Sequence, residues 1–207
     1  IDPFRADLIE DIAKNNETIF RNFKDFVSDA IGTYINWWKF PEKSQQEFLA
    51  LIPHMKKDMV DNLETIMPKK HFKELTKNYA EDRKKLKKIE YNQSPPGKKT
   101  YSLDPIRLGI IEEIINTENV SKKINSVETF CDNAIALYVT WWTKPVNAQP
   151  LMYAIWPYMP TKTKSDWKNN PNEMWRETYM AFDRAANEYL KGKNKKSTNF
   201  KDSSLTN

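Results

Sequence analysis

Apolar side chains recur at steps of three and four residues along most of this chain, the spacing that places them on one face of an α-helix. The longest stripe predicts a helix from about Glu17 to Trp38, and a second stripe predicts a helix that ends at Trp142. Pro41 and Pro145 follow these stripes and prevent either helix from continuing. The first stripe contains Ile19, Phe20, Phe23, Phe26, Val27, Ala30, Ile31, Tyr34, Ile35 and Trp38.

Shorter helices are expected around these two. Ser44 and Glu47 have the spacing of a capping box, which places the start of a third helix just after Ser44. Asn170 and Pro171 are typical of the cap and the first residue of a last helix, which we expect to end near Lys191. Only four glycines occur in 207 residues, whereas β-hairpins need glycine-bearing turns. These patterns predict an all-α protein.

One stretch of the chain occurs twice. Residues 26–55 align with residues 130–159 at a constant shift of 104 positions, without a gap. Eleven of the thirty aligned pairs are identical, where composition alone would give about two. Upstream, residues 8–12 match residues 110–114 once two extra residues are allowed in the second copy. The identical pairs are Phe26/Phe130, Ala30/Ala134, Ile31/Ile135, Tyr34/Tyr138, Trp37/Trp141, Trp38/Trp142, Pro41/Pro145, Gln45/Gln149, Ala50/Ala154, Pro53/Pro157 and Met55/Met159.

The repeat predicts an internal duplication of a four- to five-helix unit. A unit of about 80 residues is small for an independent core, so we expect both units to pack as one pseudo-twofold helical bundle. Two separate units on a linker are the alternative. Residues 5–90 form the first expected unit, 91–103 a linker with proline and glycine, and 104–191 the second unit. Residues 192–207 are polar and are expected to form a disordered basic tail.

Positive charge is unevenly placed along the chain, whose net charge is +5. Segment 69–99 holds eleven Lys or Arg against four Asp or Glu, and segment 191–207 holds five Lys and one Asp, so the remainder is acidic. A solvated lysine-rich helix face is one interpretation, and a site for an anionic partner is the other. The residues of that candidate site are Lys69, Lys70, Lys73, Lys77, Lys84, Lys85, Lys87, Lys88, Lys98 and Lys99.

The repeated tryptophan pairs allow two interpretations. Trp38 and Trp142 fall on the apolar stripes, where they would pack over the turn that follows each helix. Trp37 and Trp141 lie about 100° round the helix, at the margin of the stripe. They would either complete the core or form an exposed aromatic platform for a partner.

The candidate chemistry of the chain is sparse. The single cysteine, Cys131, lies in an apolar stripe, and His54 and His71 align with Tyr158 and Met174 in the second copy. No Gly-rich phosphate loop, HExxH or CxxC motif occurs. We therefore expect no catalytic residues, no metal site, no cofactor and no enzymatic activity. One cysteine excludes an intrachain disulfide, and without a signal-peptide pattern it favours an intracellular protein.

Two classes of function fit these observations. A non-enzymatic helical interaction or structural module would dock a protein partner or drive self-assembly, and we rank it first because the chain outside the basic segments is acidic. A nucleic-acid-binding protein that uses the lysine-rich face and the basic tail is the alternative, with phosphate contacts dominating. Membrane association is least favoured: no transmembrane segment is present, and the basic helix lacks a broad apolar face.

Overall fold

The computed structural model describes residues 1, 3–17, 19–55, 60–61, 73 and 101–202, with side chains as far as Lys193. Within this part of the chain all regular structure is helical and no strand occurs, which confirms the all-α prediction. The expected first unit and linker fall partly on residues outside the described ranges, so their boundaries stay predictions.

The first half of the chain contains three α-helices and one short 3-10 helix among its described residues. They are α1 (Pro3–Asn15), α2 (Phe23–Lys39), α3 (Pro41–Ala50) and η1 (Ile52–His54). The N-terminus of α2 is capped by Asn22, whose side chain accepts hydrogen bonds from two backbone N–H groups of the first turn. Helix α2 therefore begins later than the apolar stripe predicts.

The second half contains six described α-helices and a second 3-10 helix. They are α7 (Pro105–Ile115), α8 (Glu118–Ser121), α9 (Val127–Thr143), α10 (Pro145–Ile155), η2 (Trp156–Tyr158), α11 (Thr161–Lys168) and α12 (Glu173–Asp202). The bounds of α2 and α9 differ by 104 residues at both ends, and so do those of η1 and η2. Equivalent backbone breaks separate the helices: Phe40 has φ −141° and ψ 70°, and Lys144 has φ −148° and ψ 73°.

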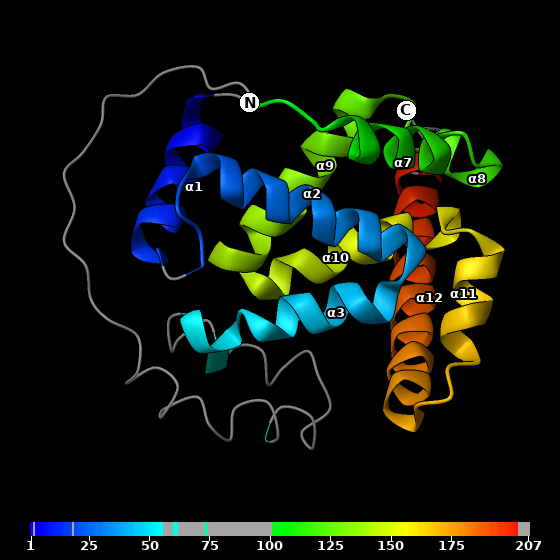
Figure 1. The fold of residues 1–207 in the computed structure, drawn as a ribbon. Helices are drawn as coiled ribbons and strands as arrows, with labels where there is room; N and C mark the ends of the chain where they lie inside the picture. Colours follow the sequence, from blue (N-terminus) through cyan, green and yellow to red (C-terminus); the bar gives the residue numbers. More distant parts are fainter. Residues whose placement is uncertain (2, 18, 56–59, 62–72, 74–100, 203–207) are drawn as a thin grey trace.

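Helices α2 and α9 pack against each other at the centre of the core (Figure 1). Phe26 packs edge-to-face on Tyr138 with ring centroids 5.0 Å apart, and Tyr34 packs on Phe130 at 4.8 Å. All four side chains are buried. Helices α1 and α7 each contact both α2 and α9. The two halves of the chain therefore bury their long helices in one shared core.

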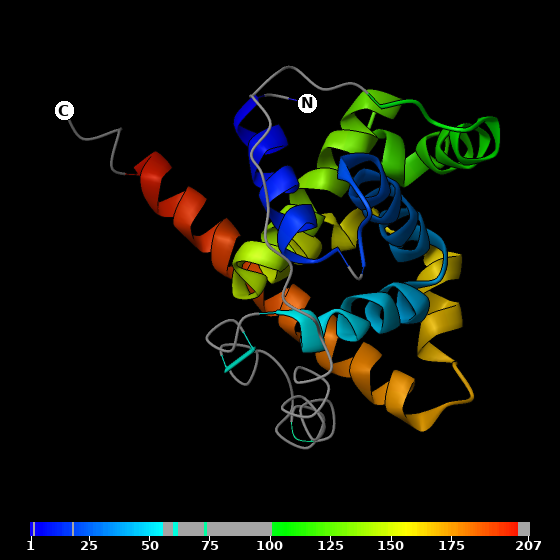
Figure 2. The same cartoon turned by 60° about the vertical axis from the view of Figure 1, so that its left-hand side comes forward.

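A second group of aromatic side chains joins the end of α2 to α12. Trp37 lies 5.8 Å from Trp167 and 5.3 Å from Phe182, measured between ring centroids. Trp156 packs on both Trp167 and Phe182. Figure 2 shows that α12 then continues beyond the other helices toward the C-terminus.

Two further predicted helix boundaries differ from the structure. Helix α3 begins at Pro41 rather than after Ser44, because proline suits the first turn of a helix. Ser44 is buried and Glu47 bonds to α2, so these two residues do not form the expected capping box. Helix α12 continues past the predicted end near Lys191 to Asp202, since Gly192 does not adopt the left-handed conformation that commonly ends a helix.

Candidate functional site

The structure corrects the exposed-platform hypothesis for Trp37 and Trp141. Trp37 is 0% exposed and Trp141 is 6% exposed, so neither ring can stack on a partner. Trp141 packs on Phe48 with ring centroids 4.9 Å apart. Both indoles complete the core because the helix margins on which they lie are covered by α12 and α3, which the stripe of one helix alone cannot predict.

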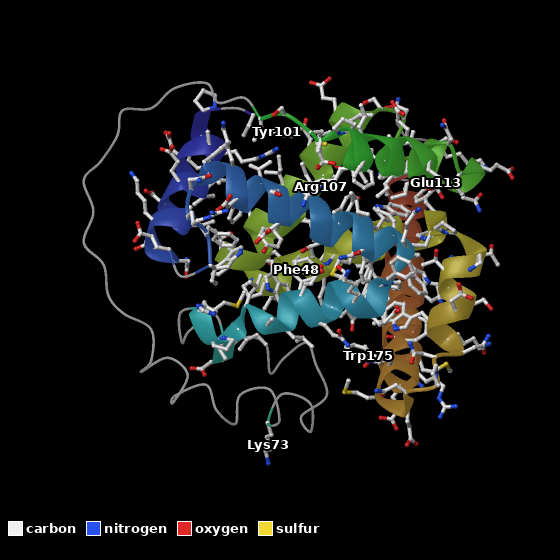
Figure 3. All side chains as sticks on the ribbon, in the orientation of Figure 1. Phe48, Lys73, Tyr101, Arg107, Glu113 and Trp175 are labelled. Carbon is white, nitrogen blue, oxygen red and sulfur yellow. The ribbon has the colours of Figure 1, made fainter. Side chains whose placement is uncertain are left out.

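The predicted lysine site lies almost wholly outside the described residues. Of its ten members only Lys73 is described, and it is exposed. Figure 3 shows Lys73 on the opposite side of the molecule from Arg107 and Glu113. The remaining members, Lys69, Lys70, Lys77, Lys84, Lys85, Lys87, Lys88, Lys98 and Lys99, lie outside the described ranges, so the nucleic-acid hypothesis stays a prediction.

Polar side chains surround the Trp156 ring at the junction of η2, α11 and α12. The Trp156 indole N–H donates a 3.0 Å hydrogen bond to Asp183, and Asn187 donates to the other oxygen of that carboxylate at 3.2 Å. The Lys164 ammonium lies 5.2 Å from the centroid of the Trp156 ring. Burial lowers the pKa of Lys164, and the nearby Asp183 partly offsets this effect. These contacts fix the helices to one another.

Asp29 of α2 and Glu47 of α3 are two carboxylates close enough to interact electrostatically. The Asn36 side chain donates a 2.7 Å hydrogen bond to Glu47, whose other oxygen is buried without a hydrogen-bond partner. Burial raises the pKa of Asp29, Asp25 and Glu47 raise it further, and Arg107 acts in the opposite direction. Across the described residues, no three His, Cys, Asp or Glu side chains are grouped so that they could hold a metal ion.

The single cysteine is not placed for nucleophilic chemistry. Cys131 is a buried free thiol on α9. Burial raises its pKa, and the Tyr101 side chain beside it lowers it only in part. The thiol is therefore protonated at neutral pH, whereas a nucleophilic cysteine needs a thiolate.

Helix α7 carries apolar side chains on both its inner and its outer face. Ile111, Ile114 and Ile115 are buried against the core, whereas Ile106 is 77% exposed. The outer face also carries Leu108, the exposed Gly109 and the partly buried Ile110. We call these four residues, Ile106, Leu108, Gly109 and Ile110, the α7 face.

Helix α10 has a second apolar outer surface. Leu151 is 43% exposed, Val146 and Asn147 are also exposed, and Pro150 and Ala154 are partly exposed. We call these five residues, Val146, Asn147, Pro150, Leu151 and Ala154, the α10 face. The sequence pattern does not identify the α7 face or the α10 face. An apolar residue in a helix is normally assigned to the core, and only the folded structure shows whether neighbouring elements cover it.

The comparisons with family models, curated proteins and solved structures give no match for this chain. None of the described helices, including the 30-residue α12, is both long and apolar enough to cross a membrane.

Proposed function

We propose that this protein is a non-enzymatic helical interaction module, and that its α7 face docks an amphipathic helix of a partner protein. The observation that carries the proposal is the exposure of Ile106 and Leu108, which flank Gly109 on opposite sides, on a helix whose inner face is already buried. A surface helix normally has a polar outer face, whereas a helix that is apolar all round is normally buried.

The apolar surface of the α7 face favours a helical partner. Burying an isoleucine side chain contributes roughly 1.5–3 kcal/mol, so covering Ile106 and Leu108 would supply a substantial part of a binding free energy. Gly109 lies between them on the helix surface, and a Cβ atom built at this position meets nothing within 4 Å. A partner helix could therefore approach the backbone of α7 closely.

Charge narrows the chemistry of the partner. The charged side chains on the exposed part of α7 are the acids Glu112 and Glu113. Arg107, the one basic residue of α7, is directed toward α2, where it donates to the Ser28 carbonyl oxygen at 3.1 Å. A partner helix with apolar anchors flanked by Lys or Arg complements this face.

Helix α7 is attached near both of its ends, which would lower the entropy cost of docking. The Asp104 side chain caps α7 by accepting from the Arg107 backbone N–H at 2.9 Å. Lys39 of α2 forms a 2.8 Å ion pair with Glu113 near the other end of α7. Figure 3 shows both Arg107 and Glu113 along the boundary of α7 with α2.

We also infer that the two halves are duplicated units related by a pseudo-twofold axis between α2 and α9. The supporting contacts are reciprocal: under the 104-residue shift, the pair Phe26–Tyr138 becomes the pair Phe130–Tyr34, and both pairs pack in the core. Self-complementary contacts of this kind are typical of a twofold interface. The α1 residue Arg5 reaches Asp132 of α9 at 3.9 Å, as Arg107 of α7 reaches α2.

Site-specific photocrosslinking tests the docking proposal. A benzoylphenylalanine at Ile106 should form a discrete adduct in extract of cells that make the protein, and Leu108→Glu should abolish it. The same photoreactive residue at Met180, an exposed apolar position on α12, is the matched control. An adduct whose crosslinked segment is an amphipathic helix with Lys or Arg flanks supports the proposal. No adduct above the Met180 control, or one insensitive to Leu108→Glu, would contradict it.

A further inference from the structure

The α10 face differs from the equivalent face of α3 in being uncharged and more apolar. Under the 104-residue shift, Glu42, Lys43 and Glu47 of α3 are replaced by Val146, Asn147 and Leu151 of α10. The whole segment 145–161 contains no Asp, Glu, Lys or Arg. Loss of charged residues with gain of apolar ones is the compositional mark of an interface core.

The buried side of both helices is alike, so the fold does not require this change. Pro41 and Pro145 are both buried, and so are Ser44 and Ala148. On the outer side the first half has Glu42 and the exposed Lys43, where the second half has the exposed Val146 and Asn147. Glu47, which aligns with the half-exposed Leu151, bonds instead to Asn36 of α2. The apolar residues of the α10 face are therefore free to serve contacts outside this chain.

The absence of charge on the α10 face indicates which kind of partner can bind there. In a twofold contact each residue near the axis faces its own copy, so any charge there meets a like charge. The α10 face carries no charge, so two copies of it would not repel each other. The equivalent face of α3 carries Glu42 and Lys43, and either residue would meet a like charge if it lay near the axis. A second copy of this chain brings an identical uncharged face, and the net charge of +5 leaves no long-range electrostatic attraction to assist it.

We infer that the α10 face is a self-association surface, on which α10 of a second copy packs across a twofold axis. The inference deepens the proposed interaction module and rests on it. The face lies on a single helix of eleven residues. A stable interface uses about 20–30 residues and buries about 800 Å² on each partner, so this contact is small. We therefore expect a weak dimer, with a micromolar dissociation constant.

Sedimentation equilibrium of the full chain tests this inference. The wild-type protein should associate reversibly to a dimer, and Leu151→Glu and Asn147→Glu should each raise the dissociation constant at least about tenfold. Gln46→Glu, at an exposed position on the equivalent face of α3, carries the same charge change and should leave the constant within about twofold. Leu151→Glu should preserve the fold, since Leu151 is 43% exposed and a glutamate there can reach solvent. Far-ultraviolet circular dichroism checks this.

The salt dependence of dimer formation distinguishes an apolar contact from an electrostatic one. Apolar self-association should hold or strengthen between about 50 and 500 mM salt, because salt screens the repulsion between two positively charged copies. A wild-type protein that stays monomeric, a dimer that survives Leu151→Glu, or a dimer that dissociates with rising salt would each overturn the inference. None of these outcomes affects the photocrosslinking test at Ile106, so the two proposals fail separately.

Discussion

Among single residues, most positions that are identical in the two aligned stretches lie in the interior, although Ala50 and Pro157 are exposed. Phe26 and Phe130 are both fully buried, and Met55 and Met159 are both buried. Positions that differ are found on the surface as well as in the core, so a difference alone does not identify a functional residue. Exposure must be known before an apolar residue can be assigned to a binding surface, and the sequence does not give it.

Asp29 gives a prediction at this scale. Burial raises the pKa of its carboxyl above 3.8, so the folded protein binds that proton more tightly than the unfolded chain. Ionised Asp29 therefore destabilises the fold as pH rises above this value. Asp29→Asn, which installs the residue found at the aligned position 133, should raise the free energy of unfolding at pH 7, and with it the thermal midpoint. The gain should be less than about 1 kcal/mol because the side chain retains contact with solvent.

The stability gain from Asp29→Asn should depend on pH. The gain from Asp29→Asn should disappear as pH falls below about 4, where the carboxyl is protonated in both states. Melting curves at pH 7 and pH 3.5 measure both values. A variant less stable than the wild type at pH 7 would mean that attraction to Arg107 outweighs burial at this site.

Among the helices, the presence and the C-terminal ends of α2 and α9 follow from the sequence, because long apolar stripes that end at proline leave few alternatives. The start of α2 does not, since the Asn22 cap begins the helix later than the stripe does. The start of α3 could not be predicted in this way, because the sequence contains two possible start signals. Pro41 suits a first helical turn, and Ser44 with Glu47 has the spacing of a capping box. Packing in the folded chain favours the start at Pro41. The α7 face could not be predicted, because α7 is apolar on both sides and its sequence does not show which side the core covers.

Gly32 provides a prediction for α2. It lies inside the helix, its aligned residue is Ala136, and a Cβ atom there would meet only Arg107 Nη2 at an ordinary 3.9 Å. Gly32→Ala should therefore stabilise the protein by about 0.5–1 kcal/mol by reducing the entropy of the unfolded chain. Urea denaturation measures this gain.

The matched control for Gly32→Ala is a second glycine substitution, in α7. Gly109→Ala also introduces a Cβ atom into open space within a helix, and it should give a similar gain. Loss of stability in Gly32→Ala alone would show that Arg107 cannot accommodate the added methyl group.

At the scale of the whole molecule, the duplication in the sequence predicts one body, and the α2–α9 contacts support that interpretation over two separate units. The arrangement of the tryptophans was not predictable from one copy. Trp37 is covered by Trp167 and Phe182, which follow it in the chain by more than a hundred residues. Contacts that distant leave no local signal in the sequence.

Scanning calorimetry of the full chain tests whether both halves share one core. The distinction between the inner and outer faces of the helices depends on that shared core. If α2 and α9 unfold together, the protein should show one transition whose van't Hoff and calorimetric enthalpies agree, and Phe130→Leu should lower the temperature of that whole transition. Two resolved transitions, or a Phe130→Leu effect confined to one of them, would show that the halves are independent domains and would contradict this account.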